Sequence, residues 1–375
     1  MTEPKERPLA FFIPALNGGG AQRVVVNLAN AFCELTDRPV HVVLVRKTGA
    51  FLSDLRPNVR VVDLGAGSTL FSLPRLALYF ARQRPEVVMS TLRYANVICI
   101  LAWVLSLRRS RLIIREANVV VLSLKMPIKE RIVVSLMRVL YPLVERVIAN
   151  SEDTALSLLN AGMKPRRGIV VLPNPVMTAG YSPPVPRASD LVRLVPTLPS
   201  GTRFICSVGR LAWQKGFDIL LMSFSQVCDP DLHLVIVGQG PEERIIRRLC
   251  AELGLESRVH LPGFVSCPER VMARSSGFVL ASRWEGFGNV IVEALALGLP
   301  VVATDCPGGP GHILNHGEFG ILVSVDDAAS LADGIERMLT NPPATPATRR
   351  KRAQDFSVER VAPAYLRVLL PKPMA

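Results

Sequence analysis

The sequence lacks a disulfide framework. Its seven cysteines are odd in number and scattered over 375 residues, and no two of them form a CxxC pair. Cysteines used in this way are typical of proteins that stay in a reducing compartment. We therefore expect a cytoplasmic location.

Long apolar runs are also missing. The longest near-apolar run, Ala95–Leu107, is shorter than the roughly 20 helical residues that cross a bilayer. It predicts a buried helix instead. The opening residues, MTEPKERP, contain no apolar signal core, so no secretory leader is expected.

What the sequence does have is enough apolar material for two domains. The chain is longer than one core normally supports, and 49% of its residues are hydrophobic. In residues 1–176, short apolar runs alternate with amphipathic stretches, which predicts a parallel, doubly wound α/β sheet. The expected strands of this domain lie at residues 9–13, 40–45, 59–61, 87–89, 112–114, 146–149 and 169–172.

A proline-rich linker follows this first domain. Five prolines fall within residues 177–202, where the alternation of strands and helices lapses. The alternation resumes over residues 203–353 and predicts a second sheet of the same kind. A last helix is expected at about residues 354–370, within a C-terminal segment that spans 354–375.

The most informative segment reads EGFGNVIVEALALG and covers residues 285–298. Glycines precede an apolar helix there, and the free N–H groups and positive dipole end of such a helix suit a phosphate. Glu293 lies about one turn inside the helix, where its carboxylate needs hydrogen-bond donors such as a ribose diol. Glu285 lies on the loop and faces the other end of the ligand. The alternative is an ordinary helix with one exposed glutamate.

A second segment, FICSVGRLAWQKGFDILL at residues 204–221, strengthens the phosphate interpretation. An apolar strand ends at Val208, Gly209 allows a tight exit, and Arg210 and Lys215 stand on the loop before a helix. A planar guanidinium and a flexible ammonium together suit the two phosphates of a diphosphate. The alternative is a solvated surface loop, but the two segments together favour a nucleotide diphosphate.

These motifs resemble retaining glycosyltransferase family 4. The pattern G-R-L-x-x-x-K-G, followed about 70 residues later by E-x7-E, is similar to that family, and the likeness covers nearly the whole chain. It includes GGGAQRVVVNLAN, ERVIANSED, VVLPNPV, LHLVIVGQGPE, VHLPGF, GLPVVATDCPGGP and GEFGILV. The resemblance implies the GT-B fold, with two Rossmann-like doubly wound domains facing each other across a cleft. It also implies that the C-terminal helix returns to the first domain.

The resemblance also implies residue roles. Arg210 and Lys215 would bind the donor diphosphate, Glu293 the ribose, and Glu285 the sugar. The loop at Gly263 would contact the base. The implied donor-binding residues are Gly19, Gly20, Gly209, Arg210, Lys215, Gly263, Phe264, Glu285, Gly286, Phe287, Gly288, Asn289, Val290 and Glu293. The implied catalytic residues are Glu285, Arg210, Lys215 and Glu116.

Ligands of open parallel sheets bind beyond the carboxyl ends of the strands, and this rule sorts the remaining candidates. The NGGGA segment, residues 17–21, follows the first strand and opens a helix, so its amides suit a phosphate or the acceptor; a plain tight turn is the alternative.

The chain departs from the family pattern at two places. Many members of the family have Arg-Glu after GGP, where this chain has Gly311 and His312. Some have a histidine near Ala117, which leaves Glu116 as the nearest polar candidate.

No metal or cofactor is expected. Asp229-Pro230-Asp231 has D-x-D spacing but precedes a strand, so it predicts a turn. His312 and His316 have i,i+4 spacing but no third ligand, and residues 315–317 favour a helix stop. Gly238-Gln239-Gly240 lacks the third glycine of a dinucleotide fingerprint, because Glu243 occupies its place.

Positive charge is concentrated in the first half of the chain. Residues 1–180 hold 24 lysines and arginines against 12 acidic residues, whereas the remainder holds 20 against 19. Residues 122–143 interleave apolar side chains with Lys125, Lys129, Arg131 and Arg138, a pattern typical of an amphipathic helix on an anionic membrane. A core helix with a solvated basic face is the alternative. No nucleic-acid-binding motif accompanies the charge.

Together with these patterns, the family resemblance implies a metal-independent, retaining hexosyltransferase. Its donor is a nucleotide sugar, with UDP-sugar favoured over GDP-sugar, and its acceptor is a saccharide, lipid-linked in the favoured case, in polysaccharide, lipopolysaccharide or glycolipid assembly. The enzyme would be cytoplasmic or peripheral on the cytoplasmic face of the inner membrane. The alternatives are a nucleotide-sugar epimerase of related fold and a non-catalytic nucleotide-sugar or carbohydrate-binding protein.

Overall fold

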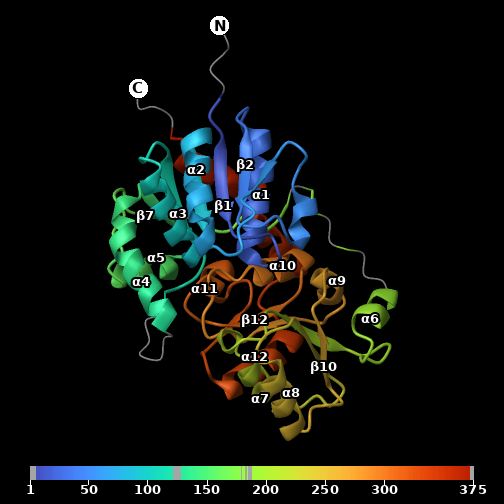
Figure 1. The fold of residues 1–375 in the computed structure, drawn as a ribbon. Coiled ribbons are helices and arrows are strands. Elements are labelled where there is room, and N and C mark those ends of the chain that lie inside the picture. The colour runs from blue at the N-terminus through green and yellow to red at the C-terminus, as the bar shows by residue number, and fades with distance from the viewer. Residues whose placement is uncertain (1–5, 121–127, 179, 182–183, 185–187, 372–375) are drawn as a thin grey trace. The chain divides into compact units, whose positions relative to one another are not determined.

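The chain divides into two compact units in the computed structural model (Figure 1). The structure describes residues 6–120, 128–178, 180, 181, 184 and 188–371. The first unit comprises residues 1–179 and 357–375, and the second comprises residues 180–356. Each unit is built around its own sheet and is described by itself.

Seven parallel strands form the sheet of the first unit, in the order β3-β2-β1-β4-β5-β6-β7. Each strand expected from the sequence is confirmed, with boundaries that differ by at most two residues. The strands are β1 (Leu9–Ile13), β2 (Val40–Leu44), β3 (Arg60–Asp63), β4 (Val87–Thr91), β5 (Arg111–Glu116), β6 (Arg146–Ala149) and β7 (Ile169–Val171).

Helices cover this sheet because both of its faces are apolar. Along β1, Ala10 and Phe12 pack into one core while Leu9, Phe11 and Ile13 pack into the other. A strand buried on both sides needs apolar residues at every position, which is why these strands read as continuous apolar runs. The helices are α1 (Gly20–Leu35), α2 (Leu73–Gln83), α3 (Arg93–Leu105), α4 (Ile128–Leu140), α5 (Glu152–Asn160) and α14 (Val358–Leu369). Short 3-10 turns lie at Ala50–Asp54, Leu70–Ser72 and Tyr141–Leu143.

The C-terminal helix α14 belongs to the first unit, where Figure 1 draws it in red. Its apolar face, which includes Val361 and Tyr365, is buried in the same core as β1 and α1. The backbone N–H of Val358 donates to the carbonyl oxygen of Met177 at 2.8 Å. Residues about 180 positions apart in the chain therefore build one core.

The second unit repeats the design with six parallel strands in the order β10-β9-β8-β11-β12-β13. The strands are β8 (Phe204–Val208), β9 (His233–Val237), β10 (Val259–Gly263), β11 (Phe278–Leu280), β12 (Val301–Thr304) and β13 (Ile321–Val323). The helices are α6 (Ala188–Leu194), α7 (Phe217–Phe224), α8 (Glu243–Glu252), α9 (Pro268–Met272), α10 (Asn289–Leu297), α11 (Pro310–Ile313), α12 (Ala328–Thr340) and α13 (Pro346–Ala353). Short 3-10 turns lie at Trp213–Lys215, Asn315–Gly317 and Gln354–Phe356.

Two local predictions are confirmed. The apolar run that begins at Ala95 lies in α3, whose inner face is buried. The Asp229 carboxylate accepts the N–H of Asp231 at 3.0 Å, so this segment forms the expected turn before β9. Among the helices that the structure describes, none is long and apolar enough to cross a membrane.

Two buried histidines predict a loss of stability in acid. Burial, aided by Arg60, lowers the pKa of His41 from 6.5 to about 4, and burial beside His233 does the same for His260. His41 Nδ1 lies 2.8 Å from the Tyr79 hydroxyl. Between the unfolded pKa of 6.5 and the folded pKa of about 4, these histidines bind a proton in the unfolded chain but stay neutral in the folded chain. The free energy of unfolding therefore falls as the pH drops from about 6.5 towards 4.

Urea denaturation across this pH range measures the effect. We expect His41→Gln and His260→Gln each to make the decline shallower than in the wild type. His316→Gln, at an exposed position, is the control and should leave the decline unchanged. Parallel curves for all four proteins would show that these histidines do not cause the acid sensitivity.

Candidate functional site

The loop between β8 and α7 carries two cations at the carboxyl edge of the second sheet. Arg210 is exposed, and its side chain makes no hydrogen bond or ion pair within the described part of the chain. Lys215 ends a 3-10 turn, and Gly216 follows it with a φ of 62°. A Cβ on Gly216 would lie 2.0 Å from the carbonyl oxygen of Ala281. Glycine therefore lets this loop lie against the loop after β11.

An ion pair joins these two loops. Lys215 Nζ lies 2.5 Å from Glu285 Oε1, although the two residues are 70 positions apart. The Ser282 hydroxyl donates to the same oxygen at 2.6 Å. Glu285 is only 5% exposed, and a buried carboxylate is tolerated when it is paired and hydrogen-bonded. Its charge, after burial, helps to raise the pKa of Cys306 to about 12.

Two glycines after β12 support the Glu285 loop from behind. A Cβ on Gly308 would lie 2.4 Å from the carbonyl oxygen of Glu285, and one on Gly309 would lie 2.0 Å from that of Phe287. The backbone N–H of Glu285 also donates to the carbonyl oxygen of Pro307 at 2.9 Å. The backbone of the Glu285 loop is thus held at a separation that only glycine permits.

Helix α10 begins directly after this loop, with Gly288 as its N-cap at a φ of 92°. No side chain caps the helix, and its first turn holds no acidic residue. At the other end, the buried Arg349 donates from Nε to the carbonyl oxygen of Gly298 at 3.1 Å. A cation stabilises the C-terminus of the helix while its N-terminal N–H groups, beginning at Asn289 and Val290, remain suited to an anion.

Two more predicted residues lie on this edge of the sheet. Glu293 is half-buried, one turn into α10, and its charge, with that of Glu269, adds to burial in raising the pKa of Tyr181 to about 12. At the end of β10, the N–H of Gly238 donates to the carbonyl oxygen of Gly263 at 2.9 Å. The next side chain, Phe264, is 64% exposed and offers an apolar ring.

Arg283 is a residue that the sequence motifs did not single out. Its guanidinium binds Asp218 at 2.7 Å and Asp326 at 2.7 Å, and its Nη1 donates to the carbonyl oxygen of Trp213 at 2.7 Å. It therefore fastens the Lys215 loop to the Glu285 loop. The only sequence signal was an arginine inside the motif ASRWEGFG, because its two acidic partners lie far away in the chain.

In the first unit, the NGGGA segment follows β1 and opens α1, as expected. Gly19 is the N-cap with a φ of 125°, and both Gly19 and Gly20 are exposed. Glu116 ends β5 on the same edge of the sheet, but it is buried: its Oε1 accepts hydrogen bonds from Asn96 Nδ2 at 2.8 Å and from the Tyr141 hydroxyl. Burial, and then the charge of Glu116, hold the pKa of Tyr141 well above its usual value.

Arg115, next to Glu116, is a second residue that the sequence did not identify. It is fully buried and binds the Thr91 hydroxyl at 3.1 Å, the Tyr365 hydroxyl at 3.3 Å and Asn174 Oδ1. All three partners are neutral oxygens. They tie the end of β4, the segment after β7 and helix α14 to one side chain, so Arg115 organises the carboxyl edge of this sheet.

Among the described residues, no three His, Cys, Asp or Glu side chains form a group that could hold a metal ion. His312 lies on α11 and His316 on the turn after it, where His316 has a φ of 53° and the helix has ended.

Comparisons with known proteins show which family the chain belongs to. Residues 192–356 match the model of "Glycosyl transferases group 1", and residues 18–179 match "Glycosyltransferase Family 4". The chain belongs to glycosyltransferase family 4. Its two parallel sheets are those of the GT-B fold.

Relatives match along most of the chain. An N-acetylgalactosaminyltransferase from Campylobacter jejuni, whose name specifies a diphospho-undecaprenol-linked disaccharide, is 28% identical and covers 96% of this chain and 99% of its own. The lipopolysaccharide core glycosyltransferase LpsD from Rhizobium meliloti is 29% identical over 86% of each chain. The structure of Anabaena HepE with UDP and glucose has a TM-score of 0.78 and 22% identity, covering 97% of this chain and 99% of HepE.

Gly309→Ala tests the close packing behind the Glu285 loop. Gly309 has a φ of −95°, so an alanine there is not strained by its backbone and acts only through its clash with Phe287. We expect the free energy of unfolding to fall by about 1–3 kcal/mol, as for other overpacked sites. Gly67→Ala, which faces open space, should change it by less than about 0.5 kcal/mol. Equal urea denaturation curves for the two variants would contradict the packing argument.

Proposed function

We propose that this glycosyltransferase moves a sugar from UDP-sugar, or from GDP-sugar, to a lipid-linked saccharide acceptor in polysaccharide or glycolipid assembly. The enzyme would transfer a hexosyl group with retention of configuration and without a metal. It would act in the cytoplasm, peripheral on the cytoplasmic face of the inner membrane. The seven free cysteines are consistent with a reducing compartment.

One arrangement carries the donor assignment: the uncapped N-terminus of α10 lies next to the Lys215–Glu285 pair. A diphosphate at this place would accept hydrogen bonds from the backbone N–H groups of Gly288, Asn289 and Val290. Lys215 and Arg210 would supply positive charge to its oxygens. Glu293 would accept from the ribose hydroxyls, and Phe264 beside Gly263 would pack against the base. Glu285, held by Ser282 and Lys215, would orient the sugar.

Catalysis would rest on stabilising the departing diphosphate. Negative charge develops on its oxygen atoms as the sugar bond breaks, and preorganised donors act most strongly where charge develops. Arg210, Lys215 and the N-terminus of α10 supply such donors without a metal. In this family, retention is explained by attack from the leaving-group face, with the departing phosphate assisting deprotonation of the acceptor. Glu116 would act on the acceptor, and the amides of Gly19 and Gly20 would approach a phosphate of the donor or the acceptor.

The relatives support the choice of substrates. HepE has been solved with UDP and glucose, and the Campylobacter enzyme is named for an acceptor on diphospho-undecaprenol. Release of nucleotide from the donor tests the proposal directly. A transferase releases UDP from UDP-sugar only when acceptor is present. Isomerised UDP-sugar without release would instead identify an epimerase, and tight binding without turnover would identify a binding protein.

Replacing the two donor-site cations should weaken UDP binding. Each provides a charge-assisted contact worth about 1.5–3 kcal/mol, so Arg210→Ala and Lys215→Ala should each raise the Kd for UDP by about 10- to 100-fold. Arg210→Ala should leave the melting temperature unchanged, because the side chain is exposed and unpaired within the described structure. Arg244→Ala, at another exposed arginine of the same unit, is the matched control and should bind UDP normally.

The Lys215 variant needs a further control, because it leaves Glu285 buried without its cation. Lys215→Ala should therefore melt at a lower temperature than the wild type. The double variant Lys215→Ala/Glu285→Gln should recover stability but not UDP affinity. If affinity returned together with stability, Lys215 would be a structural partner of Glu285 rather than a ligand of the diphosphate.

Helix α4 supports the peripheral membrane location. Its buried face comprises Val133, Val134, Met137 and Leu140. A second apolar stripe, Ile128, Ile132, Leu136 and Val139, is exposed along the helix, with Ile128 at 75% and Val139 at 70%. Lys129 and Arg131 flank this stripe. This arrangement of an apolar stripe between cations is typical of a helix that lies on an anionic bilayer, with the apolar side chains in the membrane and the cations at the level of the head groups. Residues 122–127 of the predicted basic segment, which include Lys125, lie outside the described residues.

Vesicle sedimentation tests this surface. The wild type should bind phosphatidylglycerol vesicles and not neutral ones, and salt should weaken the binding, since each cation near the surface contributes about 1 kcal/mol. Glutamine at Lys125, Lys129 and Arg131 should reduce binding while UDP affinity is kept. Serine at Ile132 and Val139 should do the same through lost apolar contact.

The matched control removes three exposed cations elsewhere on the first unit: Lys47, Arg82 and Lys164. It should sediment with vesicles nearly as well as the wild type. Equal losses in the control and in the α4 variants would show that total charge, rather than this helix, drives adsorption.

A further inference from the structure

An arginine-lined cavity lies at the opposite edge of the first sheet from the proposed acceptor residues. Its volume is about 450 Å³, and it opens beside Arg111, the first residue of β5, whereas Glu116 ends the same strand. A strand rises about 3.3 Å per residue, so the two ends are roughly 15–20 Å apart. Its lining includes four arginines, Arg108, Arg111, Arg166 and Arg167, together with Glu145 and Trp103.

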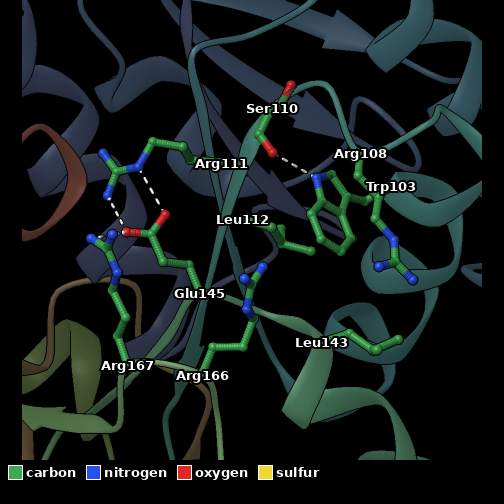
Figure 2. Close-up of a pocket in the computed structure, with 9 residues that line it drawn as sticks. All are labelled: Trp103, Arg108, Ser110, Arg111, Leu112, Leu143, Glu145, Arg166 and Arg167. Carbon is green, nitrogen blue, oxygen red and sulfur yellow. Dashed lines mark hydrogen bonds and ion pairs between the residues drawn. The ribbon is translucent and has the colours of Figure 1, made fainter.

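The acidic residue in this cavity is already neutralised. Arg111 donates to both oxygens of Glu145 at 2.8 Å, and Arg167 donates to Oε1 at 3.2 Å (Figure 2). The hydrogen bond from Arg111 is the main cause of a lowered pKa at Glu145, so the carboxylate stays charged and fixes both guanidinium groups. With four arginines and one glutamate, the lining keeps an excess of positive charge.

Two of the arginines are available to a ligand. The guanidinium groups of Arg166 and Arg108 have neither a hydrogen bond nor an ion pair with any described residue. In Figure 2, Arg166 points between Glu145 and Trp103, and Arg108 lies on the far side of the Trp103 ring. The Arg108 guanidinium carbon is 5.4 Å from the centre of that ring. The indole N–H of Trp103 donates to the carbonyl oxygen of Ser110 at 2.7 Å, which fixes the position of this ring in the lining of the cavity.

A second hollow of about 300 Å³ continues the basic surface. It shares Arg111, Glu145 and Arg167 with the first cavity and adds Arg146 and Arg367. Guanidinium groups bind phosphate oxygens in a planar, two-point manner, and arginine is favoured wherever phosphates are recognised. Trp103 is buried, so its ring face is not open to a nucleobase.

We propose that this cavity is a second anion site, which binds a phosphate-bearing group, either a phosphomonoester or a diphosphate, through Arg108 and Arg166. The site is independent of sugar transfer, because it lies at the amino ends of the strands, where these folds do not carry out chemistry. The phosphate comes from one of two sources, a free phosphate compound or a lipid head group.

Modification by an arginine-specific dicarbonyl, followed residue by residue by mass spectrometry, tests the proposal. Inorganic pyrophosphate and phosphatidylglycerol vesicles are the two probes. At a pyrophosphate concentration about ten times Kd, modification of Arg166 should slow about tenfold. Exposed Arg244 in the second unit should react at an unchanged rate. Protection by pyrophosphate points to a soluble ligand, and protection by vesicles alone points to a head group.

Two variants assign the protection to the cavity. Arg108→Gln should abolish the protection of Arg166, whereas Arg109→Gln, at the exposed neighbour that does not line the cavity, should keep it. The proposal is overturned if neither probe protects Arg166, if Arg244 is protected equally, or if Arg108→Gln leaves the protection of Arg166 intact.

Discussion

The parallel arrangement of the strands is the constraint on which both units depend. Every strand of a parallel sheet ends at the same edge, so the loops that follow β8, β10 and β11 are gathered there whatever their distance in sequence. The cost is that both faces of the sheet must be covered by helices, which in turn fixes the apolar character of the strands. The loops are then left to carry the polar chemistry. This division explains why the candidate donor residues follow strands or begin helices.

Within the second unit, the ion pair between Lys215 and Glu285 fixes the position of two of these loops relative to each other. A buried carboxylate without partners would be costly, so the cation and the Ser282 hydroxyl make its position possible. Arg283 joins the same two loops from the other side through Asp218 and Asp326. Glycines at the points of closest approach remove the steric barrier. The site is therefore preorganised by charge pairing and by missing side chains together, and Arg210 remains unpaired within the described residues.

The strands could be predicted well from the sequence, because a strand that is buried on both faces has apolar residues at nearly every position. It predicted the Lys215 and Glu285 loops because glycine and charge occur together there. It did not predict that the two side chains pair, nor that Arg283 and Arg115 are held by distant partners, because pairings of this kind depend on tertiary structure. On α4 the apolar residues formed a single mixed pattern in the sequence. Only the packing separates buried Val133 and Met137 from exposed Ile132 and Val139.

The uneven charge of the chain acquires a physical meaning from this packing. In the second unit, cations such as Arg283 and Lys215 are matched by carboxylates, which agrees with its nearly balanced composition. In the first unit, three cations of the positive excess lie where no carboxylate pairs with them. Arg115 is buried among neutral oxygens, Lys129 borders an exposed apolar stripe, and Arg166 enters a cavity whose glutamate is already bound. Arg115 is satisfied by the fold itself. The other two cations have no ion pair with a described residue, so their positive charge is available to anions outside the chain.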